Sequence, residues 1–480
     1  MLKDLNNINN QIYDIGIIGA GPAGITLALN LSKKFSVALL EGGDFDFSEN
    51  SQNIYKGNNS GDKYFDLDET RLRLFGGSSN HWGGMCRPLE NFDFKKKIFS
   101  KLSHWPLDKM DLDAYLQKAC NILEIKNNFI KKKIYKEIQE INFQFSPPVN
   151  FNSKYKKSIL YSNNIHLFLN SNALYLTPGN SLTDVLVANY KNKKFSLKAK
   201  RIILCLGGIE TSRFLLLSKS KNRSFLKNND NVGKFWMEHP HYVIGDVIFK
   251  EKNDYSKTPI KYEDLKYYVI SDRLKLEKKI LNCSLRLDRY KKNPYQKEQL
   301  KKLIYDLSCV APELSKKIFD LFDKNLVCGG RLISVSEQEP NVESFISLNN
   351  KEKDRFGLPR ANLNWKKNIQ DIKTIRTTAE IFANYFASED HGRIAIQSWL
   401  YDDKFTENDN FIAGNHHMGG CRISSSSKNG VVNHNFELHD HKNVFICGSS
   451  IFPSGGHSNP TLTIIQLALS LAKKFNNNIL

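Results

Sequence analysis

Cysteine is scarce in this sequence, with eight residues in 480. No CxxC pair and no Cys/His spacing of the kind that binds metals occurs, and CxxCH, which attaches a c-type haem, is missing too. This cysteine density is far below that of disulfide-stapled domains. We therefore predict no disulfide framework and no metal site, and we interpret the cysteines as reduced packing residues of a cytoplasmic protein.

Long apolar runs are missing as well. The longest, at 201–207 and 462–472, are well short of the roughly 18 residues that a membrane-spanning helix needs. The first residues, MLKDLNNINNQ, are polar and contain no apolar run of the signal-peptide type. We expect neither export nor an integral membrane segment.

The composition is that of a globular chain, because 40% of the residues are hydrophobic and 25% are charged. At roughly 150 residues per domain, the length allows about three domains or one enzyme of two parts. Lysine and arginine number 69 against 50 aspartates and glutamates, a net charge of +19. The lysines are scattered, as at 95–97, 131–133 and 156–157, so we expect a solvated basic surface and no nucleic-acid partner.

The first chemical signal is a βαβ pattern close to the N-terminus. Residues 15–18 are a short apolar run typical of a buried parallel strand, 25–31 indicate an apolar helix, and 36–40 indicate a second strand. A Gly-x-Gly-x-x-Gly sequence occupies the turn between the first strand and the helix. This arrangement predicts a dinucleotide-binding unit.

Each glycine of that turn has a physical role. Gly19 permits the tight turn, Gly21 lets a pyrophosphate approach the backbone, and Gly24 lets the helix pack closely on the strand. The first turn of the helix then offers free N–H groups to the phosphates. Glu41, at the end of the second strand, can accept hydrogen bonds from ribose hydroxyls, and its charge disfavours a 2′-phosphate. These residues leave FAD and NAD both open.

Glycine-rich turns recur in three later places. Residues 71–84, RLRLFGGSSNHWGG, predict a loop whose backbone can approach a flat ligand. Residues 201–218 repeat the order of strand, glycine turn and apolar helix. Near the C-terminus, NHHMGGCR at 415–422 and the turns at 448–460 place polar residues ahead of a final helix at 461–473. We interpret this last group as a ligand site.

Between these turns the sequence indicates structure but little chemistry. Residues 44–68 are polar and predict a loop, whereas 94–148 are rich in lysine and suit a lid or linker. Further along, 242–249 and 332–335 are strand-like, and 369–386 indicate an amphipathic helix.

Taken together, these blocks resemble the glucose–methanol–choline (GMC) oxidoreductase family, and the likeness covers nearly the whole chain in order. The blocks are the N-terminal βαβ unit, GGSSNHWGG, RIILCLGGIETSRFLLLS, NVGKFWMEHP, EQEPNVESFISL, GLPRANLNW, HHMGGCRI and NVFICGSSIFPSGGHSNPTLTIIQLALSLA. The resemblance implies FAD as the cofactor and the oxidation of an alcohol group.

The resemblance also implies an α/β fold, α+β overall, with a Rossmann-like FAD-binding domain and a substrate domain on an antiparallel sheet. We assign 11–93, 158–240 and 412–480 to a discontinuous FAD-binding domain, 94–157 to a lid or linker, and 241–411 to the substrate-binding domain. The active site is expected at the interface of the two domains.

Two catalytic residues follow from the family's motifs. The histidine of the H-x-x-G element corresponds to His416, and the position before Pro-Thr corresponds to Asn459. Oxidation of a CH–OH group removes the hydroxyl proton while hydride leaves the carbon for the flavin N5. An imidazole suits the general base, and an amide can donate a hydrogen bond to the developing alkoxide. We predict that His416 is the base and Asn459 the donor.

For the other histidines near these motifs we predict lesser roles. His417 is interpreted as a structural hydrogen-bond partner, because adjacent residues on a strand face opposite ways. His457 is the reserve candidate, since it lies close to Asn459 in the sequence. His239 and His241 are predicted to pack structurally.

The resemblance further implies a set of cofactor-binding residues. They are Gly19, Gly21, Gly24, Glu41, Gly77, Ser78, Asn80, His81, Gly83, Gly448, Ser449, Asn459, Pro460 and Thr461. In choline oxidases and pyranose 2-oxidases, a histidine at the place of His81 carries a covalent bond to the flavin. Two hypotheses therefore stay open: a histidyl–FAD bond at His81, or a His81 that only lines the flavin ring.

The GGSSNHWGG loop and the SNPT ending most resemble the pyranose 2-oxidase and sugar-acid dehydrogenase branches. They imply a small-molecule alcohol, in the first place a sugar, polyol or sugar derivative, as the substrate. The electron acceptor stays open among oxygen, a quinone and a protein. Two other functions also stay open, a non-catalytic flavin-binding protein and an NAD-dependent dehydrogenase.

Overall fold

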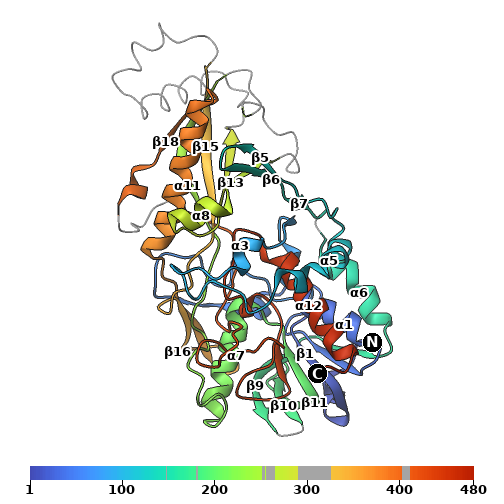
Figure 1. The fold of residues 1–480 in the computed structure, drawn as a ribbon. Helices are drawn as coiled ribbons and strands as arrows, with labels where there is room; N and C mark the ends of the chain where they lie inside the picture. Colours follow the sequence, from blue (N-terminus) through green and yellow to red (C-terminus); the bar gives the residue numbers. More distant parts are fainter. Residues whose placement is uncertain (148, 180–181, 251–254, 256–264, 290–325, 403–410) are drawn as a thin grey trace.

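The computed structural model describes residues 1–147, 149–179, 182–250, 255, 265–289, 326–402 and 411–480. Two large β-sheets follow one another along the long axis of the molecule, and both chain termini lie beside the lower one (Figure 1).

The lower sheet is built around parallel strands. Its order is β8-β2-β1-β11-β10-β9, with β20 paired to β11. The strands are β1 (Ile12–Ile18), β2 (Val37–Leu40), β8 (Ile165–Phe168), β9 (Asn172–Pro178), β10 (Thr183–Ala188), β11 (Lys194–Leu204) and β20 (Val444–Ile446). β8, β2, β1, β11 and β20 run parallel, and β2 is wholly buried, as parallel strands usually are. The first two strands predicted from the sequence are confirmed.

Three long helices flank the lower sheet. α1 (Pro22–Leu31) packs against α12 (Pro460–Asn476), and α7 (Gly207–Lys221) packs against β9. α1 begins at Pro22, whose missing N–H and fixed φ suit the first helical position. Because α1 follows β1 and precedes β2, this part of the chain is the predicted βαβ unit.

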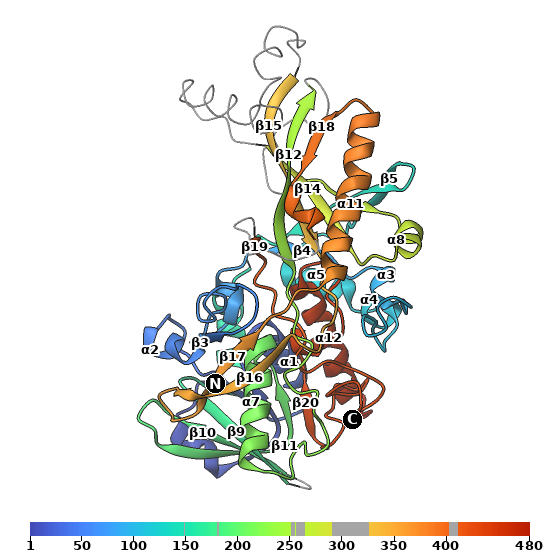
Figure 2. The ribbon, with the colours of Figure 1, turned by 90° about the vertical axis from the view of Figure 1, so that its left-hand side faces the viewer.

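The upper sheet is antiparallel and has the order β18-β12-β15-β14-β13-β6-β5, with β19 paired to β12. Its strands are β5 (Lys131–Tyr135), β6 (Ile138–Ile141), β12 (Pro240–Lys250), β13 (Tyr267–Ile270), β14 (Cys283–Arg289), β15 (Leu326–Ser336), β18 (Gly392–Ile396) and β19 (Phe411–Ala413). α11 (Ile369–Ser388) covers it (Figure 2). Phe382 and Phe386 of α11 belong to the same hydrophobic core as Tyr242 and Ile244 of β12. The predicted fold class, a Rossmann-like part joined to an antiparallel sheet, is confirmed.

A third, small sheet packs beside α7. It consists of β16 (Phe345–Lys353), β17 (Pro359–Asn364) and β3 (Gly57–Asn59), in that order. A fourth pairing joins β4 (Met85–Cys86) to β7 (Gln144–Phe145).

The remaining elements are short helices in the connections. They are η1 (Leu5–Asn10), α2 (Glu49–Gln52), η2 (Asn53–Tyr55), η3 (Gly77–Asn80), α3 (Asn91–Phe94), α4 (Lys109–Asp113), α5 (Leu116–Leu123), α6 (Phe151–Tyr161), α8 (Asp272–Lys278), η6 (Ser398–Tyr401) and η7 (Ser449–Ile451).

Two segments lie across the predicted domain boundaries. The segment 94–157 was expected to be a lid or linker, but its strands β5 and β6 extend the upper sheet and its α6 packs against α1. Likewise β16 and β17 fall within the predicted substrate domain, 241–411, yet they pair with β3 and pack on α7. In both cases a distant strand supplies the pairing, which local sequence does not reveal. The division into domains otherwise remains a prediction.

Within the described part of the chain, no helix is both long and apolar enough to cross a bilayer. The cysteine side chains that the structure describes are free and buried: Cys86, Cys120, Cys205, Cys283, Cys421 and Cys447.

Candidate active site

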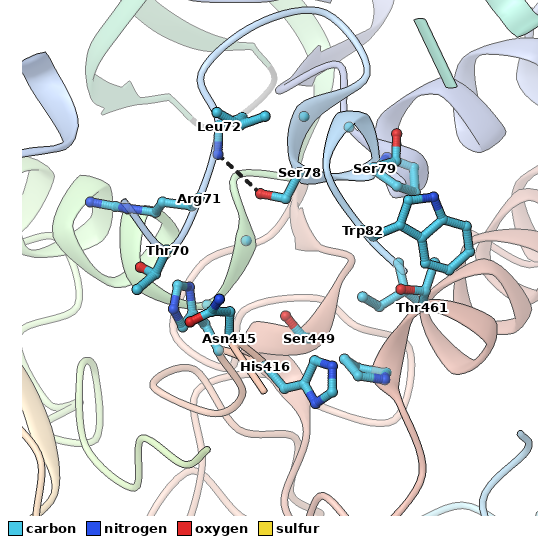
Figure 3. Close-up of a pocket in the computed structure, with 18 of the residues that line it drawn as sticks. Thr70, Arg71, Leu72, Ser78, Ser79, Trp82, Asn415, His416, Ser449 and Thr461 are labelled. Atoms are coloured by element: carbon cyan, nitrogen blue, oxygen red, sulfur yellow. Dashed lines mark hydrogen bonds between the residues drawn. The ribbon is translucent and has the colours of Figure 1, made fainter. Parts of the chain in front are cut away.

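A cavity of about 780 Å³ lies where the carboxyl ends of β1, β2 and β11 approach the upper sheet. Ile18, Leu40 and Cys205 line it from those strand ends, and His241 and Tyr267 line it from β12 and β13. In open α/β sheets, ligands bind outside the carboxyl ends of the strands, and the volume is within the range of small-molecule sites. Figure 3 shows Leu72 and Ser78 on one side of this pocket and Ser449 and His416 on the opposite side.

Most of the residues predicted from the sequence meet at this cavity. Those that line it are Gly19, Gly21, Glu41, Gly77, Ser78, His81, Gly83, His416, Ser449, Asn459, Pro460 and Thr461. Three do not line it: Gly24, Asn80 and Gly448.

The three glycines of the first turn occupy different environments. Gly19 has φ +103°, in the region that favours glycine, and a Cβ on Gly24 would lie 1.9 Å from the Gly19 carbonyl oxygen. Gly24 therefore lets α1 approach β1, as predicted, without touching the cavity. A Cβ on Gly21 would meet nothing within 4 Å. Gly21 thus leaves open space at the start of α1, where a pyrophosphate could approach the backbone.

Glu41 is fixed at the cavity wall by the backbone. Its Oε2 accepts from the Ala20 N–H over 3.0 Å, and its Oε1 accepts from the Gly43 N–H over 2.9 Å. A carboxylate has about four lone-pair sites, so Glu41 can still accept hydrogen bonds from hydroxyl groups in the cavity.

The loop around η3 is held by its own side chains. Ser78 accepts from the Leu72 N–H over 3.1 Å (Figure 3). The Asn80 amide donates to the carbonyl oxygens of Phe75, over 3.0 Å, and Gly77, over 2.7 Å. Asn80 therefore holds the turn and does not contact the cavity, because these local carbonyls occupy its donors. That Asn80 also binds the cofactor directly stays a prediction.

His416 and Asn459 come together from segments far apart in the sequence. The Asn459 Nδ2 lies 3.2 Å from the His416 Nε2. Asn459 occupies the N-cap position of α12, but its side chain makes no capping hydrogen bond, so the amide is available to His416. The two residues predicted to act together are in contact at the cavity.

Behind His416 lies a second imidazole that the sequence analysis assigned to packing alone. The His239 Nδ1 is 3.1 Å from the His416 Nδ1, and the His239 Nε2 is 3.1 Å from the Gly455 carbonyl oxygen. Glu238 Oε1 accepts the backbone N–H groups of both His239, over 2.8 Å, and His416, over 2.6 Å. We call Glu238, His239, His416, Gly455 and Asn459 the histidine corner.

Burial sets the protonation states at this corner. It lowers the pKa of His416 well below its usual range and that of His239 to about 3, so both imidazoles are neutral at neutral pH. Burial raises the pKa of Glu238 to about 7, although three donors act against this rise. The third donor is the Tyr64 hydroxyl, 2.5 Å from the Glu238 Oε2.

The other histidines have separate roles. His417 lines the cavity, and its Nε2 lies 3.1 Å from the Tyr64 hydroxyl, which agrees with the structural hydrogen bond expected of it. His457, the reserve candidate for the base, is fully buried outside the cavity lining, with its Nε2 3.7 Å from Glu90 Oε1. His241 was predicted to pack structurally but lines the cavity from β12.

Sequence reasoning also missed a charged wall of the cavity. The Arg71 guanidinium lies 3.9 Å from the centre of the Tyr55 ring and 3.2 Å from Glu210 Oε2. All three residues line the cavity. Arg71 and Glu210 lie in two different glycine-rich blocks and Tyr55 lies in η2, so no single block indicated that they meet. Only the arginine-rich start of the 71–84 loop could have drawn attention to them.

Comparison with known proteins supports the motif-based resemblance. Residues 340–468 match the family described as GMC oxidoreductase. A relative is the 2-methyl-1,2-propanediol dehydrogenase of Mycolicibacterium austroafricanum, 25% identical over 285 residues, which are 58% of this chain and 48% of that protein. Long-chain-alcohol oxidase FAO3 of Arabidopsis thaliana is 32% identical over 69 residues, 14% of this chain and 9% of that protein. The chain thus matches about half the length of the first of these relatives and less of the second.

Solved structures share the fold over nearly the whole chain. Pyridoxine 4-oxidase from Mesorbium loti superposes with a TM-score of 0.60 at 14% identity, covering 97% of this chain and 99% of the other. A formate oxidase from Aspergillus oryzae RIB40, studied for its FAD modification, superposes with a TM-score of 0.59 at 16% identity, covering 98% and 99%.

Proposed function

We propose that the chain, whose residues 340–468 match the GMC oxidoreductases, is an FAD-dependent enzyme that oxidises a CH–OH group of a small molecule. The observation that carries the proposal is the contact between the His416 Nε2 and the Asn459 amide, 3.2 Å apart at a cavity of about 780 Å³. A base and a hydrogen-bond donor beside one another are what alcohol oxidation requires of a protein.

The residues present fit an FAD. The open space at Gly21 and the start of α1 suit its pyrophosphate, and the Glu41 carboxylate suits ribose hydroxyls. The glycine-rich loop with Ser78, together with Ser449, would hold the remainder of the cofactor. When bound, FAD supplies the acceptor for the hydride that leaves the substrate carbon.

The chain's own residues handle the proton. Because the lowered pKa keeps His416 neutral, its imidazole is ready to take the hydroxyl proton across the neutral pH range. Asn459 has no ionisable group, so its N–H instead donates to the substrate oxygen as negative charge develops there. Without substrate the same N–H faces the His416 Nε2.

For the substrate, the proposal is a sugar, polyol or sugar derivative. The mixed character of one cavity wall supports it. Arg286 and Tyr267 of the upper sheet carry hydrogen-bonding groups, while Met85 and Phe145 of the β4–β7 pair, with Leu265 just before β13, are apolar. Sugars present hydroxyl groups on an apolar ring, which such a mixed wall can contact. The free, buried cysteines support a cytoplasmic location.

The test is spectroscopic and uses the full chain. Purified protein should carry a flavin absorbance spectrum, and anaerobic addition of one member of a panel of sugars, polyols and simple alcohols should bleach it. A colourless protein that reduces NAD would instead support the NAD-dependent alternative. A flavin that no alcohol of the panel reduces would support the non-catalytic alternative.

Covalent attachment at His81 is part of the proposal, supported by the exposed position of His81 at the cavity. Acid precipitation of the purified protein tests it. Yellow colour in the pellet, lost in His81→Ala, is the expected result. Colour released into the supernatant would mean that His81 only lines the flavin site.

A further inference from the structure

We propose that His239 is a positioning residue that fixes the proton of His416 on Nδ1 and so presents the Nε2 lone pair to the cavity. The catalytic consequence rests on the proposed function, whereas the protonation pattern does not. The proposal follows from the hydrogen-bonding partners of two neutral rings.

The backbone carbonyl next to His239 determines which of its two ring nitrogens carries the proton. Its Nε2 lies 3.1 Å from the carbonyl oxygen of Gly455, which can only accept a hydrogen bond. A neutral imidazole carries one N–H, and it must therefore be at Nε2. The His239 Nδ1 is left as an acceptor.

The tautomer of His239 in turn determines the tautomer of His416. Its Nδ1 lies 3.1 Å from the acceptor Nδ1 of His239, so it carries the single proton of the ring and donates it. The Nε2 of His416 is then unprotonated and accepts from the Asn459 Nδ2–H over 3.2 Å. With the proton on Nε2 instead, two lone pairs would face each other at Nδ1, and two N–H groups would face each other at Asn459. Only one arrangement pairs every atom of the series.

The backbone keeps the two rings at this distance. The main chains of Met237 and Met418 exchange two hydrogen bonds of 2.8 and 3.0 Å, which pairs the segment before β12 with the loop that carries His416. The Glu238 Oε1 also accepts the backbone N–H groups of His239 and His416, one on each side of this pairing. The rings meet edge to face, with their centres 5.2 Å apart and their planes at 83°.

This arrangement has a consequence for the proton. When the substrate O–H bond breaks, its proton forms a new bond to the His416 Nε2, and the ring becomes an imidazolium. The Nδ1–H remains where it was and its hydrogen bond to His239 strengthens, because the donor is now charged. In the Ser-His-Asp arrangement, loss of the group that fixes the tautomer costs about 10⁴-fold in kcat.

The first experiment reads the tautomer directly. In holoenzyme labelled with ¹⁵N-histidine, His416 should show a protonated Nδ1 and an unprotonated Nε2, its signals being those absent from His416→Asn. A protonated Nε2 would overturn the proposal. This measurement needs no turnover, so the tautomer can be established even if the chain oxidises no alcohol. Likewise, alcohol oxidation could be established even if the tautomer proves to be the other one.

The second experiment changes His239. His239→Leu removes the acceptor and should populate the other tautomer of His416 and lower kcat/KM by at least about 100-fold with flavin retained. The side-chain oxygen of His239→Asn can accept a hydrogen bond near the position of Nδ1. This variant should therefore restore part of the original tautomer population and part of kcat/KM. His434→Asn, at an exposed histidine, is the control. Equal kcat/KM in the Leu and Asn variants, or an unchanged tautomer in His239→Leu, would overturn the proposal.

Discussion

The nucleotide turn, residues 19–24, and the histidine corner stand at the same cavity but are built in opposite ways. The turn is a single short stretch of chain, and its geometry depends on backbone atoms, such as the carbonyl of Gly19 that Gly24 must clear. The histidine corner brings together three segments, with His239 and His416 177 residues apart, and its side chains bond to one another where the backbone has paired these segments. A change in the turn should therefore act on cofactor binding and stability, whereas a change in the corner should act on proton transfer.

The largest effect expected from breaking the corner is on catalysis. His416→Asn keeps a polar side chain but cannot take a proton, so kcat should fall by about 10²- to 10⁴-fold. Flavin content should be unchanged, because the turn is untouched. Rapid-mixing measurement of flavin reduction, together with the flavin-to-protein absorbance ratio, checks both. Near-normal turnover in this variant would remove His416 as the base.

Removing the Asn459 amide should lower kcat somewhat less than removing the His416 imidazole. Asn459→Ala is expected to lower kcat by about 10²- to 10³-fold, since it deletes one hydrogen bond to the developing oxyanion. α12 should not be destabilised, because the Asn459 side chain caps nothing. Asn459→His, which retains a ring N–H, is the matched variant and should be the more active of the two. A loss of thermal stability equal in both would argue for a structural role instead.

The turn can be tested with a pair of alanines. Gly24→Ala places a Cβ 1.9 Å from a carbonyl oxygen, so the protein should lose about 1–3 kcal/mol of stability and most of its flavin. The added Cβ of Gly21→Ala meets nothing within 4 Å, so the unfolding midpoint of the apoprotein should not change. The Cβ would occupy the space proposed for the pyrophosphate, so FAD should bind about tenfold more weakly. Thermal melts and flavin titration distinguish the two. Identical behaviour would contradict the separate roles of these glycines.

The last effect expected is a pH dependence of stability that belongs to the corner. The pKa of Glu238 is raised to about 7 in the folded protein, from about 4.3 when unfolded. The folded state therefore holds the extra proton between these values, and the stability that Glu238 contributes is lost as pH rises through 7. Glu238→Gln does not titrate, so its free energy of unfolding relative to wild type should rise between pH 4.5 and 7. A pH-independent difference in denaturant titrations would contradict the raised pKa.

The turn was predictable and much of the corner was not. Gly19, Gly21, Gly24 and Glu41 form a local pattern whose spacing follows from the geometry of one strand and one helix. His416 and Asn459 were identified through motif resemblance, but their contact depends on how α12 is placed against the loop after β19. His239 gave no signal, because a histidine beside proline resembles any other buried histidine until its partner is known. The partners of Asn80 were equally hidden, since they are carbonyl oxygens of its own turn.

By itself, the sequence determined the βαβ unit, the glycine turns, the reduced cysteines and the two residues suited to alcohol chemistry. These depend on neighbours along the chain, on residue type or on patterns of short range. The tertiary structure decided which histidine lies behind His416, that β5 and β6 extend the upper sheet, and that Glu238 accepts hydrogen bonds from two distant segments. Each of these depends on hydrogen bonds between remote segments. The sequence shows that a residue can donate or accept, but it does not show which distant group is its partner.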